Sequence, residues 1–406
     1  MSVNLPVRDS MHKEATSIIQ SHIAFVIGTF GHGRGGHYWD VKTISESINS
    51  FESVIVFNIG CKPSPVLERS NIKVINVPLN FIEAVTVVKK YVVDLNVKTI
   101  FCIDIRVSLI PALVSNFTRT PMVLIKPGGP NPSKRYPVTK DFIVYSLENY
   151  LYFKNINDFK KTTIHFLPNR SCRVNVNKEL VANIRDGRNE IFTFVQIIRI
   201  TKEYAKNLYQ SIDMIRKLNA TNNYRVSLNI IGVVQDEKLF KDLCNYSKDQ
   251  SVSFYTSGEY TNCASELLLS GDAVIANGRS VMEAASLGLP ILISAKNTTL
   301  PVLLDKDNFE RAFKVNFSPR FEVELSRDGE QCHLNHIKKL INDNGYLSEV
   351  RSHSLQCYQR YFNVESVVDR YIDISNCQKF TKISVVSLFL MIKAYVYSVA
   401  KLWLGN

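Results

Sequence analysis

The stretch NGRSVMEAASLGLPILI, residues 277–293, predicts a short helix between two buried strands. The preceding run DAVIA (272–276) is short and apolar, as a buried strand is, and an apolar run also follows the helical letters. Ser280 is placed to cap the helix, with Glu283 three residues later completing a capping box, and Gly288 is the expected stop. A strand–helix–strand unit of this kind is typical of a parallel α/β sheet.

The start of this helix is also a candidate anion site. Backbone N–H groups in the first turn of a helix point at whatever binds there and favour negative charge. We therefore expect the backbone around Gly278, Arg279 and Ser280 to meet a diphosphate, and the Glu283 carboxylate to accept hydrogen bonds from a ribose diol. Capping alone is the simpler explanation of Ser280 and Glu283.

A second strand-to-helix loop, GTFGHGRGGHYWD (28–40), holds five of the seventeen glycines. Glycines let the backbone approach a ligand closely, so the start of the helix at Gly35 and Gly36 is a further phosphate candidate. His37 either contacts a ligand there or is an ordinary capping residue. The loop matches G-x-G-x-x-G, but the next strand candidate (53–60) ends without the carboxylate that a dinucleotide ribose needs. A purely structural turn is the remaining alternative.

The rest of the chain alternates short apolar runs with helical stretches, and this pattern restarts near residue 190. We therefore predict an α/β protein of two doubly wound Rossmann-like domains that face each other across a cleft. The expected divisions are 1–188, 189–360, a helix at 361–378 that crosses back to the first domain, and an amphipathic tail at 379–406.

The composition of the chain limits the classes of partner that it is expected to bind. The formal charge of +12 and pI near 9.2 favour an anionic partner, either a phosphorylated substrate or an acidic membrane surface. Nucleic acid is disfavoured because the basic residues form no long run and no zinc-finger or RNP-type motif is present. Eight scattered cysteines without a C-x-x-C pair, together with no apolar signal sequence at the N-terminus, predict reduced thiols in the cytoplasm.

GRSVMEAASLGLPIL (278–292) resembles the donor-binding signature of retaining GT-B glycosyltransferases of family 4. The resemblance covers about residues 20–375, and GRGGH (33–37), FLPN (166–169) and QIIRITKEYAK (196–206) resemble further family motifs in the same order. It implies transfer of a sugar from a nucleotide-diphosphate sugar, with retention at the anomeric carbon. It also implies a site whose cations and helix N-termini stabilise the leaving diphosphate, without a metal or other cofactor.

The resemblance assigns roles residue by residue. Arg199, Lys202 or Lys206, and Glu283 are the expected catalytic groups. On the donor side it adds six residues: Gly35, Gly36, Gly232, Gly278, Arg279 and Ser280. On the acceptor side it adds five: His37, Asp104, Lys126, Gly128 and Gly129. Ordinary alternatives are surface solvation for Lys126 and helix capping for Asp104.

The sequence departs from the family pattern at three places. The pattern often has two glutamates in Glu-x7-Glu, and Ile275 stands where the first is expected, before Glu283. Tyr204 occupies the usual place of the clamp lysine, and Val234 replaces the glycine expected after Gly232. The one Asp-x-Asp triplet, at 305–307, lies in a polar stretch and is more consistent with solvated surface than with a metal site.

The tail KFTKISVVSLFLMIKAYVYSVAKLWLGN (379–406) lies outside the resemblance. On a helical wheel one apolar face forms, opposite Lys382, Lys393 and Lys401; its members are Val385, Leu388, Ile392, Val396, Val399 and Trp403. This arrangement predicts an interfacial helix on the inner face of an anionic membrane, with docking onto the first domain as the alternative. A transmembrane helix is disfavoured because Lys393 would lie at mid-bilayer.

We therefore expect a cytoplasmic, peripherally membrane-bound glycosyltransferase that acts on a saccharide or polyprenyl-linked acceptor in surface polysaccharide or glycolipid synthesis. Two alternatives stay open. One is a sugar-nucleotide 2-epimerase of the same architecture, although the sequence shows no clear set of acid and base residues for it. The other is a degenerate transferase that serves as a partner subunit, which the missing first glutamate favours.

Overall fold

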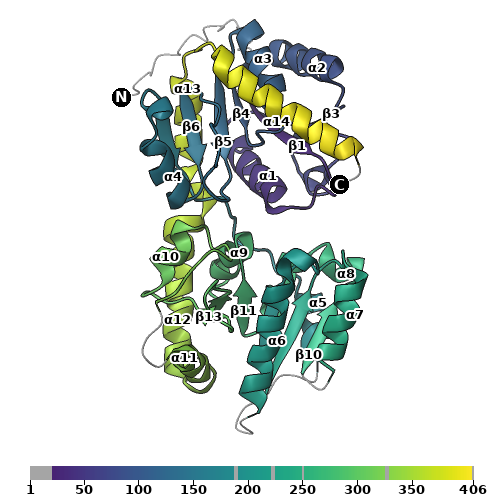
Figure 1. Ribbon diagram of the computed structural model, residues 1–406, viewed down its shortest axis with the longest axis vertical. Coiled ribbons are helices and arrows are strands. Elements are labelled where there is room, and N and C mark those ends of the chain that lie inside the picture. Colours follow the sequence, from purple (N-terminus) through teal and green to yellow (C-terminus); the bar gives the residue numbers. More distant parts are fainter. Residues whose placement is uncertain (1–20, 187–190, 221–224, 249–250, 325–328, 405–406) are drawn as a thin grey trace, which may run out of the picture.

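A computed structural model describes residues 21–186, 191–220, 225–248, 251–324 and 329–404. The chain forms two α/β domains, one above the other in Figure 1, each built on its own sheet. The predicted pair of doubly wound domains is thus confirmed. The expected boundary between residues 188 and 189 lies outside the described residues, as do residues 1–20 at the N-terminus.

The N-terminal sheet has seven parallel strands in the order β3-β2-β1-β4-β5-β6-β7. Strand order reverses between β1 and β4, which in such sheets is where ligand-binding loops gather at the carboxyl ends. The strands are β1 (His22–Thr29), β2 (Val54–Gly60), β3 (Lys73–Val77), β4 (Val97–Cys102), β5 (Met122–Lys126), β6 (Asp141–Val144) and β7 (Thr163–Phe166).

Helices cover both faces of this sheet because its strands are apolar on both sides. One face packs against α1 (Gly36–Asn49) and, from the far end of the chain, α13 (Val368–Cys377). The other face packs against α2 (Phe81–Asp94), α3 (Leu109–Thr118), α4 (Leu147–Lys154) and α14 (Val385–Trp403). The C-terminal segment therefore completes the core of the N-terminal domain, as Figure 1 shows in yellow.

The C-terminal sheet has six strands in the order β10-β9-β8-β11-β12-β13, and only β13 is antiparallel. It repeats the order of the first sheet, so β8 and β11 flank the second reversal point. The strands are β8 (Phe192–Ile197), β9 (Val226–Ile231), β10 (Val252–Tyr255), β11 (Ala273–Ala276), β12 (Ile291–Ile293) and β13 (Val302–Leu303).

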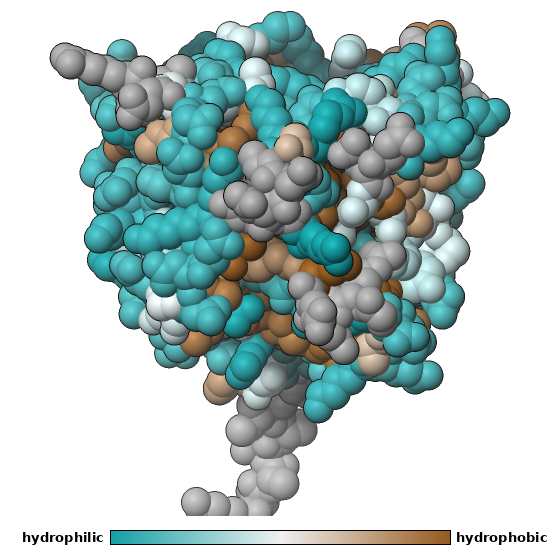
Figure 2. Space-filling model, turned by 90° about the horizontal axis from the view of Figure 1, so that it is seen from below, coloured by the Kyte–Doolittle hydropathy of each residue, from teal (hydrophilic) through white to brown (hydrophobic). Residues whose placement is uncertain are grey.

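Eight described helices accompany the C-terminal sheet. Among them, α5 precedes residue 189 in sequence but packs on this domain, through Ile184. The helices are α5 (Lys178–Arg185), α6 (Ala205–Asn219), α7 (Glu237–Tyr246), α8 (Gly258–Thr261), α9 (Arg279–Ser286), α10 (Phe309–Lys314), α11 (Glu330–Asn342) and α12 (Asn344–Cys357). The free end of this domain carries mostly hydrophilic side chains, with hydrophobic ones gathered towards its middle (Figure 2).

The tail helix α14 docks on the N-terminal domain. The docked side of the helix is not the side that the sequence predicted to be polar. Met391 and Tyr395 are buried in the core, and the Tyr395 hydroxyl donates to the Leu79 carbonyl at 2.6 Å. Leu388 and Val399, expected on the exposed face, are partly buried against the same core. The opposite side of the helix carries exposed apolar residues, which we call the apolar stripe: Val385, Phe389, Ile392, Val396 and Trp403.

Of the described helices, α14 is the one long and apolar enough to cross a bilayer by length and composition. The helix can be docked on one side and carry the apolar stripe on the other, because the residues of each set recur at helical spacing on opposite sides of the helix. Docking onto the first domain, the alternative expectation for the tail, is thus confirmed, whereas the membrane contact stays a prediction.

Candidate active site

Two helix starts meet where the domains touch. Helix α1 begins after Gly35 and helix α9 begins after Gly278, each directly behind a strand next to a reversal point of its sheet. A Cβ atom placed on Gly36 would lie 3.9 Å from the Cβ of Arg279. No described side chain caps either helix, so both first turns present N–H groups to the junction between the domains.

The start of α9 differs from the sequence prediction. Gly278, with φ of +58°, is the N-cap residue, and Ser280 lies inside the first turn. The Ser280 hydroxyl accepts from the Asn277 N–H at 3.1 Å and donates to the Asn277 carbonyl, so it fixes the preceding loop. The predicted capping box is wrong, because a glycine in a left-handed conformation already makes the turn into the helix.

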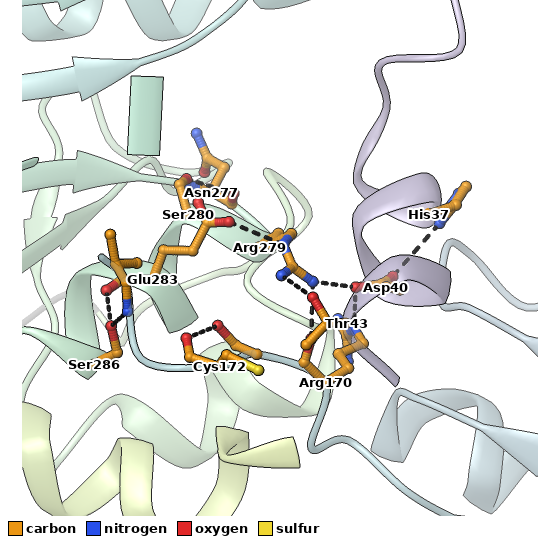
Figure 3. A network of polar contacts seen from close by, with 12 residues as sticks. His37, Asp40, Thr43, Arg170, Cys172, Asn277, Arg279, Ser280, Glu283 and Ser286 are labelled. Carbon is orange, nitrogen blue, oxygen red and sulfur yellow. Dashed lines mark hydrogen bonds and ion pairs between the residues drawn. The ribbon is translucent and has the colours of Figure 1, made fainter. Parts of the chain in front are cut away.

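The Glu283 carboxylate instead pairs with Arg279, one turn earlier on α9, at 2.9 Å. Arg279 then reaches across to the N-terminal domain, where its guanidinium donates to Asp40 at 2.8 Å and to the Thr43 hydroxyl at 3.0 Å. It also donates to the Arg170 carbonyl at 2.8 Å. Figure 3 shows this guanidinium between α9 and α1. The Arg279 side chain is therefore an interdomain link, while the N–H groups of its helix turn stay at the junction.

Asp40 is a residue of this site that the sequence reasoning missed. It lies one turn into α1, is buried, and faces Arg170 at 3.3 Å as well as Arg279. Burial alone would raise the pKa of the Asp40 carboxyl, but Arg170, His37 and Arg279 outweigh it and hold the pKa below its usual value. Asp40 thus stays ionised between two arginines. Its position one helical turn after the glycines was the available signal.

Arg170 is the second residue that was missed. It follows the FLPN segment, is buried, and stacks on the Tyr145 ring with 4.9 Å between the guanidinium carbon and the ring centroid. It also donates to Asn316 of the C-terminal domain at 2.6 Å. Because Arg170 contacts residues of both domains, the crossing segment is tied into the network around Asp40.

The proposed cationic clamp lies at the carboxyl edge of the C-terminal sheet. Arg199 follows β8, is exposed, and lies against Tyr204, with the guanidinium donating to the hydroxyl at 3.2 Å. Lys206 donates to the Lys296 carbonyl at 3.0 Å. Lys202 has an 87% exposed side chain that lies 3.9 Å from Asp236. Since β8 neighbours β11, Arg199 and the start of α9 follow adjacent strands.

Two positions in the donor motifs have packing explanations. A Cβ on Gly232 would lie 1.7 Å from the Ile198 carbonyl oxygen, so only glycine fits where β9 ends beside β8. Ile275, which stands at the position of the first family glutamate, is fully buried in the core of the C-terminal sheet. A glutamate in that orientation would lose its hydration, which accounts for an aliphatic residue there.

On the N-terminal side, Asp104 follows β4 and forms a two-pronged pair with Arg106, with closest contact 2.6 Å. It also accepts the Arg106 backbone N–H, so it caps its own loop. Arg106 in turn covers the Phe30 ring at 4.6 Å. His37 is exposed and lies 3.9 Å from Asp40. Asp104, Arg106 and Phe30 thus link the end of β4 to the glycine loop.

Lys126, expected on the acceptor side with surface solvation as the alternative, is not a surface lysine. It ends β5, is 8% exposed, and donates to the Gly128 carbonyl at 2.6 Å. Burial lowers the pKa of this ammonium to about 8, against the attraction of Glu148. A Cβ on Gly128 would lie 2.9 Å from the Asn316 amide, so this loop packs against the C-terminal domain at Gly128, whereas a Cβ on Gly129 would lie 3.9 Å from the Lys126 ammonium.

The Asp-x-Asp triplet has a structural role. Asp305 accepts the backbone N–H groups of Asp307 and Asn308 at 3.0 and 3.1 Å, and so shapes the turn before α10. Among the described residues, no group of three or more His, Cys, Asp or Glu side chains is placed to hold a metal ion.

Solved structures share this architecture. HepE from Anabaena, in complex with UDP and glucose, is 13% identical, with a TM-score of 0.60 over 88% of this chain and 100% of that one. A glycosyltransferase from Rickettsia africae is 11% identical, with a TM-score of 0.65 over 88% and 98%. A putative UDP-N-acetylglucosamine 2-epimerase from Listeria monocytogenes is 10% identical, with a TM-score of 0.57 over 88% and 96%.

No protein-family model matches the sequence, and no curated protein matches it. The similarity to these structures is therefore a similarity of fold. In this chain the fold consists of two α/β sheets with the same strand order and a helix that returns to the first domain. The chain has the GT-B fold, with the starts of α1 and α9 in contact at the junction between its domains.

Proposed function

We propose that this protein is a glycosyltransferase that moves a sugar from a nucleotide-diphosphate sugar to a saccharide or lipid-linked acceptor. The observation that carries the proposal is the contact between two helix starts without a described side-chain cap, with 3.9 Å between the Gly36 and Arg279 Cβ positions. Two sets of backbone N–H groups at one place suit the two phosphates of a diphosphate better than any neutral ligand.

The reaction breaks the bond between the sugar and the diphosphate, so negative charge develops on the departing diphosphate. The proposed stabilising groups are Arg199, with Lys202 or Lys206, and the N–H groups behind Gly35 and Gly278. Arg199 is exposed beside the start of α6, where it is available to a ligand. In this proposal the reaction is retaining and hexosyl-transferring, and it uses these cations in place of a metal ion.

Glu283 is the proposed contact for the donor ribose. Its carboxylate is held by Arg279, which fixes one oxygen and leaves the other available for a hydroxyl. Among the structures that share the fold, HepE binds UDP-glucose and the Listeria protein is named for a UDP-sugar. A uridine-diphosphate sugar is accordingly the first donor to test.

Membrane association is the second part of the proposal. Besides the apolar stripe of α14, Ile82 at the start of α2 and Phe117 at the end of α3 are exposed on helices that pack on the same sheet face as α14. Lys393 covers the Phe389 ring at 4.4 Å, and Lys401 lies near the C-terminus of the helix. Apolar side chains flanked by lysines are typical of helices in the plane of an anionic membrane surface. A polyprenyl-linked acceptor in surface polysaccharide or glycolipid synthesis, on the cytoplasmic side, fits such an enzyme.

A 2-epimerase is the second candidate, and the Listeria structure favours it, since that fold is shared as well. The two reactions differ in one requirement: epimerisation needs no acceptor. A catalytically degenerate subunit is the third candidate, favoured by the buried Ile275.

The test is a thermal-shift screen of nucleotide sugars, followed by product analysis of each binder with and without membrane lipid extract as acceptor. A donor at 100 times its Kd stabilises the folded state by about 2.7 kcal/mol. Sugar transferred to lipid only when the extract is present supports the transferase. A new nucleotide sugar formed without any acceptor identifies an epimerase, and tight binding without either product identifies a degenerate subunit. No shift with any nucleotide sugar overturns the proposal.

A further inference from the structure

A cavity of about 210 Å³ lies at the end of the N-terminal sheet opposite to the domain junction. Its walls come from the residues just before β5, β6 and β7 and from the segment 378–384 that leads into α14. The candidate active site is built from residues that follow strands, so the two places are at opposite edges of the same sheet. The cavity is smaller than the pockets of about 300–1,000 Å³ that hold drug-sized ligands, so it suits a small group.

The lining of this cavity, which we call the lysine pocket, combines apolar residues with exposed lysines and hydroxyl-bearing residues. Four lysines contribute to it, and no acidic residue does: Lys140, Lys161, Lys379 and Lys382. None of the four forms an ion pair within the described part of the chain. The nearby Asp141 carboxylate contacts His165 at 2.9 Å. Four hydroxyl-bearing residues, Thr139, Thr162, Thr381 and Ser384, add hydrogen-bonding groups.

The chemistry of this lining selects an oxyanion. Lys140 has the Asp141 carboxylate nearby, whereas Lys161, Lys379 and Lys382 form no described ion pair. Ammonium groups that share one cavity repel one another, and a group with several negative oxygens relieves that repulsion. Hydroxyl groups donate to the same oxygens. A phosphate meets both conditions in a small volume, whereas a neutral sugar meets only the second and an apolar group meets neither.

The position of the pocket indicates which kind of molecule carries that phosphate. Lys382 and Ser384 line the pocket, and the next two residues, Val385 and Val386, are 81% and 53% exposed at the start of the apolar stripe. The pocket thus opens beside the end of a surface that is apolar and lysine-flanked. Nearby, Arg119 covers the Phe380 ring at 5.9 Å, so the positive charge extends around this end of α14. A phosphate placed here while acyl chains contact the stripe belongs to a lipid.

We propose that the lysine pocket binds the phosphate of an anionic phospholipid headgroup and so orients the N-terminal domain on the membrane. The inference rests on the proposed membrane association of α14 and deepens it, because it adds a headgroup site to an apolar contact. It predicts that binding has two separable parts: the stripe binds any bilayer, and the pocket adds affinity for anionic lipid.

The experiment is flotation of the full-length protein with two kinds of vesicle, phosphatidylcholine alone and an equimolar mixture of phosphatidylcholine and phosphatidylglycerol. The pocket variant carries Lys140→Gln and Lys161→Gln, which lie outside α14. The matched control carries Lys238→Gln and Lys241→Gln on α7, both exposed, so it has the same net charge. A lysine near an anionic surface contributes about fivefold to binding, so the pocket variant should lose about 25-fold on mixed vesicles.

Three results support the proposal together: a loss on mixed vesicles for the pocket variant, near wild-type binding for the control, and no difference between the two variants on phosphatidylcholine. Equal losses in the pocket variant and the control overturn it and leave only the general attraction of a basic protein. Saturable binding of inorganic phosphate that depends on Lys140 and Lys161, without any vesicle effect, overturns the lipid assignment in favour of a soluble anion. Wild-type protein that binds neither vesicle overturns the membrane association itself, which separates that failure from a failure of the pocket.

Discussion

Asp40 in α1 and Arg279 in α9 are 239 residues apart in sequence, and their side chains meet at 2.8 Å across the domain junction. The pair joins the two helices whose first turns form the proposed diphosphate site. Asp40 also faces Arg170, and Arg279 also holds Glu283, so one buried network fixes the distance between the domains. Under the proposed function, a diphosphate that enters between the helix starts would compete with Asp40 and Glu283 for the same guanidinium.

Arg279→Met should destabilise the protein strongly. It leaves Asp40 and Glu283 buried without their shared cation, and breaking a buried ion pair costs about 3–5 kcal/mol. Urea unfolding measures the loss. The control is Arg106→Met, because the Arg106 side chain is 44% exposed and its pair with Asp104 lies within one domain, so its loss should cost less, about 1 kcal/mol. Similar losses in the two variants would show that Arg279 has no special part in joining the domains.

Glu283→Gln should weaken nucleotide-sugar binding while the fold stays intact. The amide keeps the size of the side chain but loses the charge that accepts strongly from a ribose hydroxyl, a change of about 1–2 kcal/mol, or about tenfold in Kd. Calorimetric titration with UDP-sugars measures it. Glu237→Gln, on the exposed first turn of α7, is the control. An unchanged Kd for every nucleotide sugar that binds the wild type would remove Glu283 from the site.

Arg199→Ala should lower kcat by about 100-fold, because it removes a cation from the developing charge of the leaving diphosphate. Its side chain is exposed and contacts mainly Tyr204, so the free energy of unfolding should change little. Lys202→Ala and Lys206→Ala identify the second member of the clamp by the same assay. Turnover that stays at the wild-type level in all three variants contradicts the proposed clamp.

Lys126→Met should change how stability depends on pH. The folded-state pKa is about 8 and the ordinary value is 10.5, so between these values the unfolded chain holds a proton that the folded lysine has released. The free energy of unfolding of the wild type therefore rises with pH across this window. The methionine variant lacks that rise.

The variant should accordingly be more stable than the wild type below pH 8, by about 2 kcal/mol once the lost hydrogen bond to Gly128 is counted, and this advantage should fall above pH 8 and be lost before pH 10.5. Urea unfolding at a series of pH values tests it, with the exposed Lys238→Met as control. An advantage that is constant across the range would mean that Lys126 does not titrate there.

Phe389→Ser with Val396→Ser should release the protein from membranes. Each side chain loses about 1.5–3 kcal/mol of apolar burial, so binding to phosphatidylcholine vesicles should fall by at least about 100-fold for the pair. Deleting the whole tail is a poorer test, because Met391 and Tyr395 belong to the core of the N-terminal domain. Phe51→Ser, an exposed apolar residue at the end of α1, is the control. Unchanged flotation of the double variant would rule out the stripe.

The sequence by itself determined the two α/β domains and the strand-to-helix loops that carry the proposed site. These features depend on local rules: apolar runs of strand length, helical spacing and glycine at turns. The glycine loop before α1 and the helix after β11 were predicted from such signals, although α9 begins after Gly278 and not at the predicted cap Ser280.

Only the tertiary structure decided which side chains meet. The network of Asp40, Arg170 and Arg279 joins residues far apart in sequence, and no local pattern records such a contact. Lys126 was expected on the surface because lysines are usually solvated, but the neighbouring domain and loop bury it. Likewise, the wheel of α14 showed an apolar face, but the position of the N-terminal core determined which side of the helix is buried and which is left exposed.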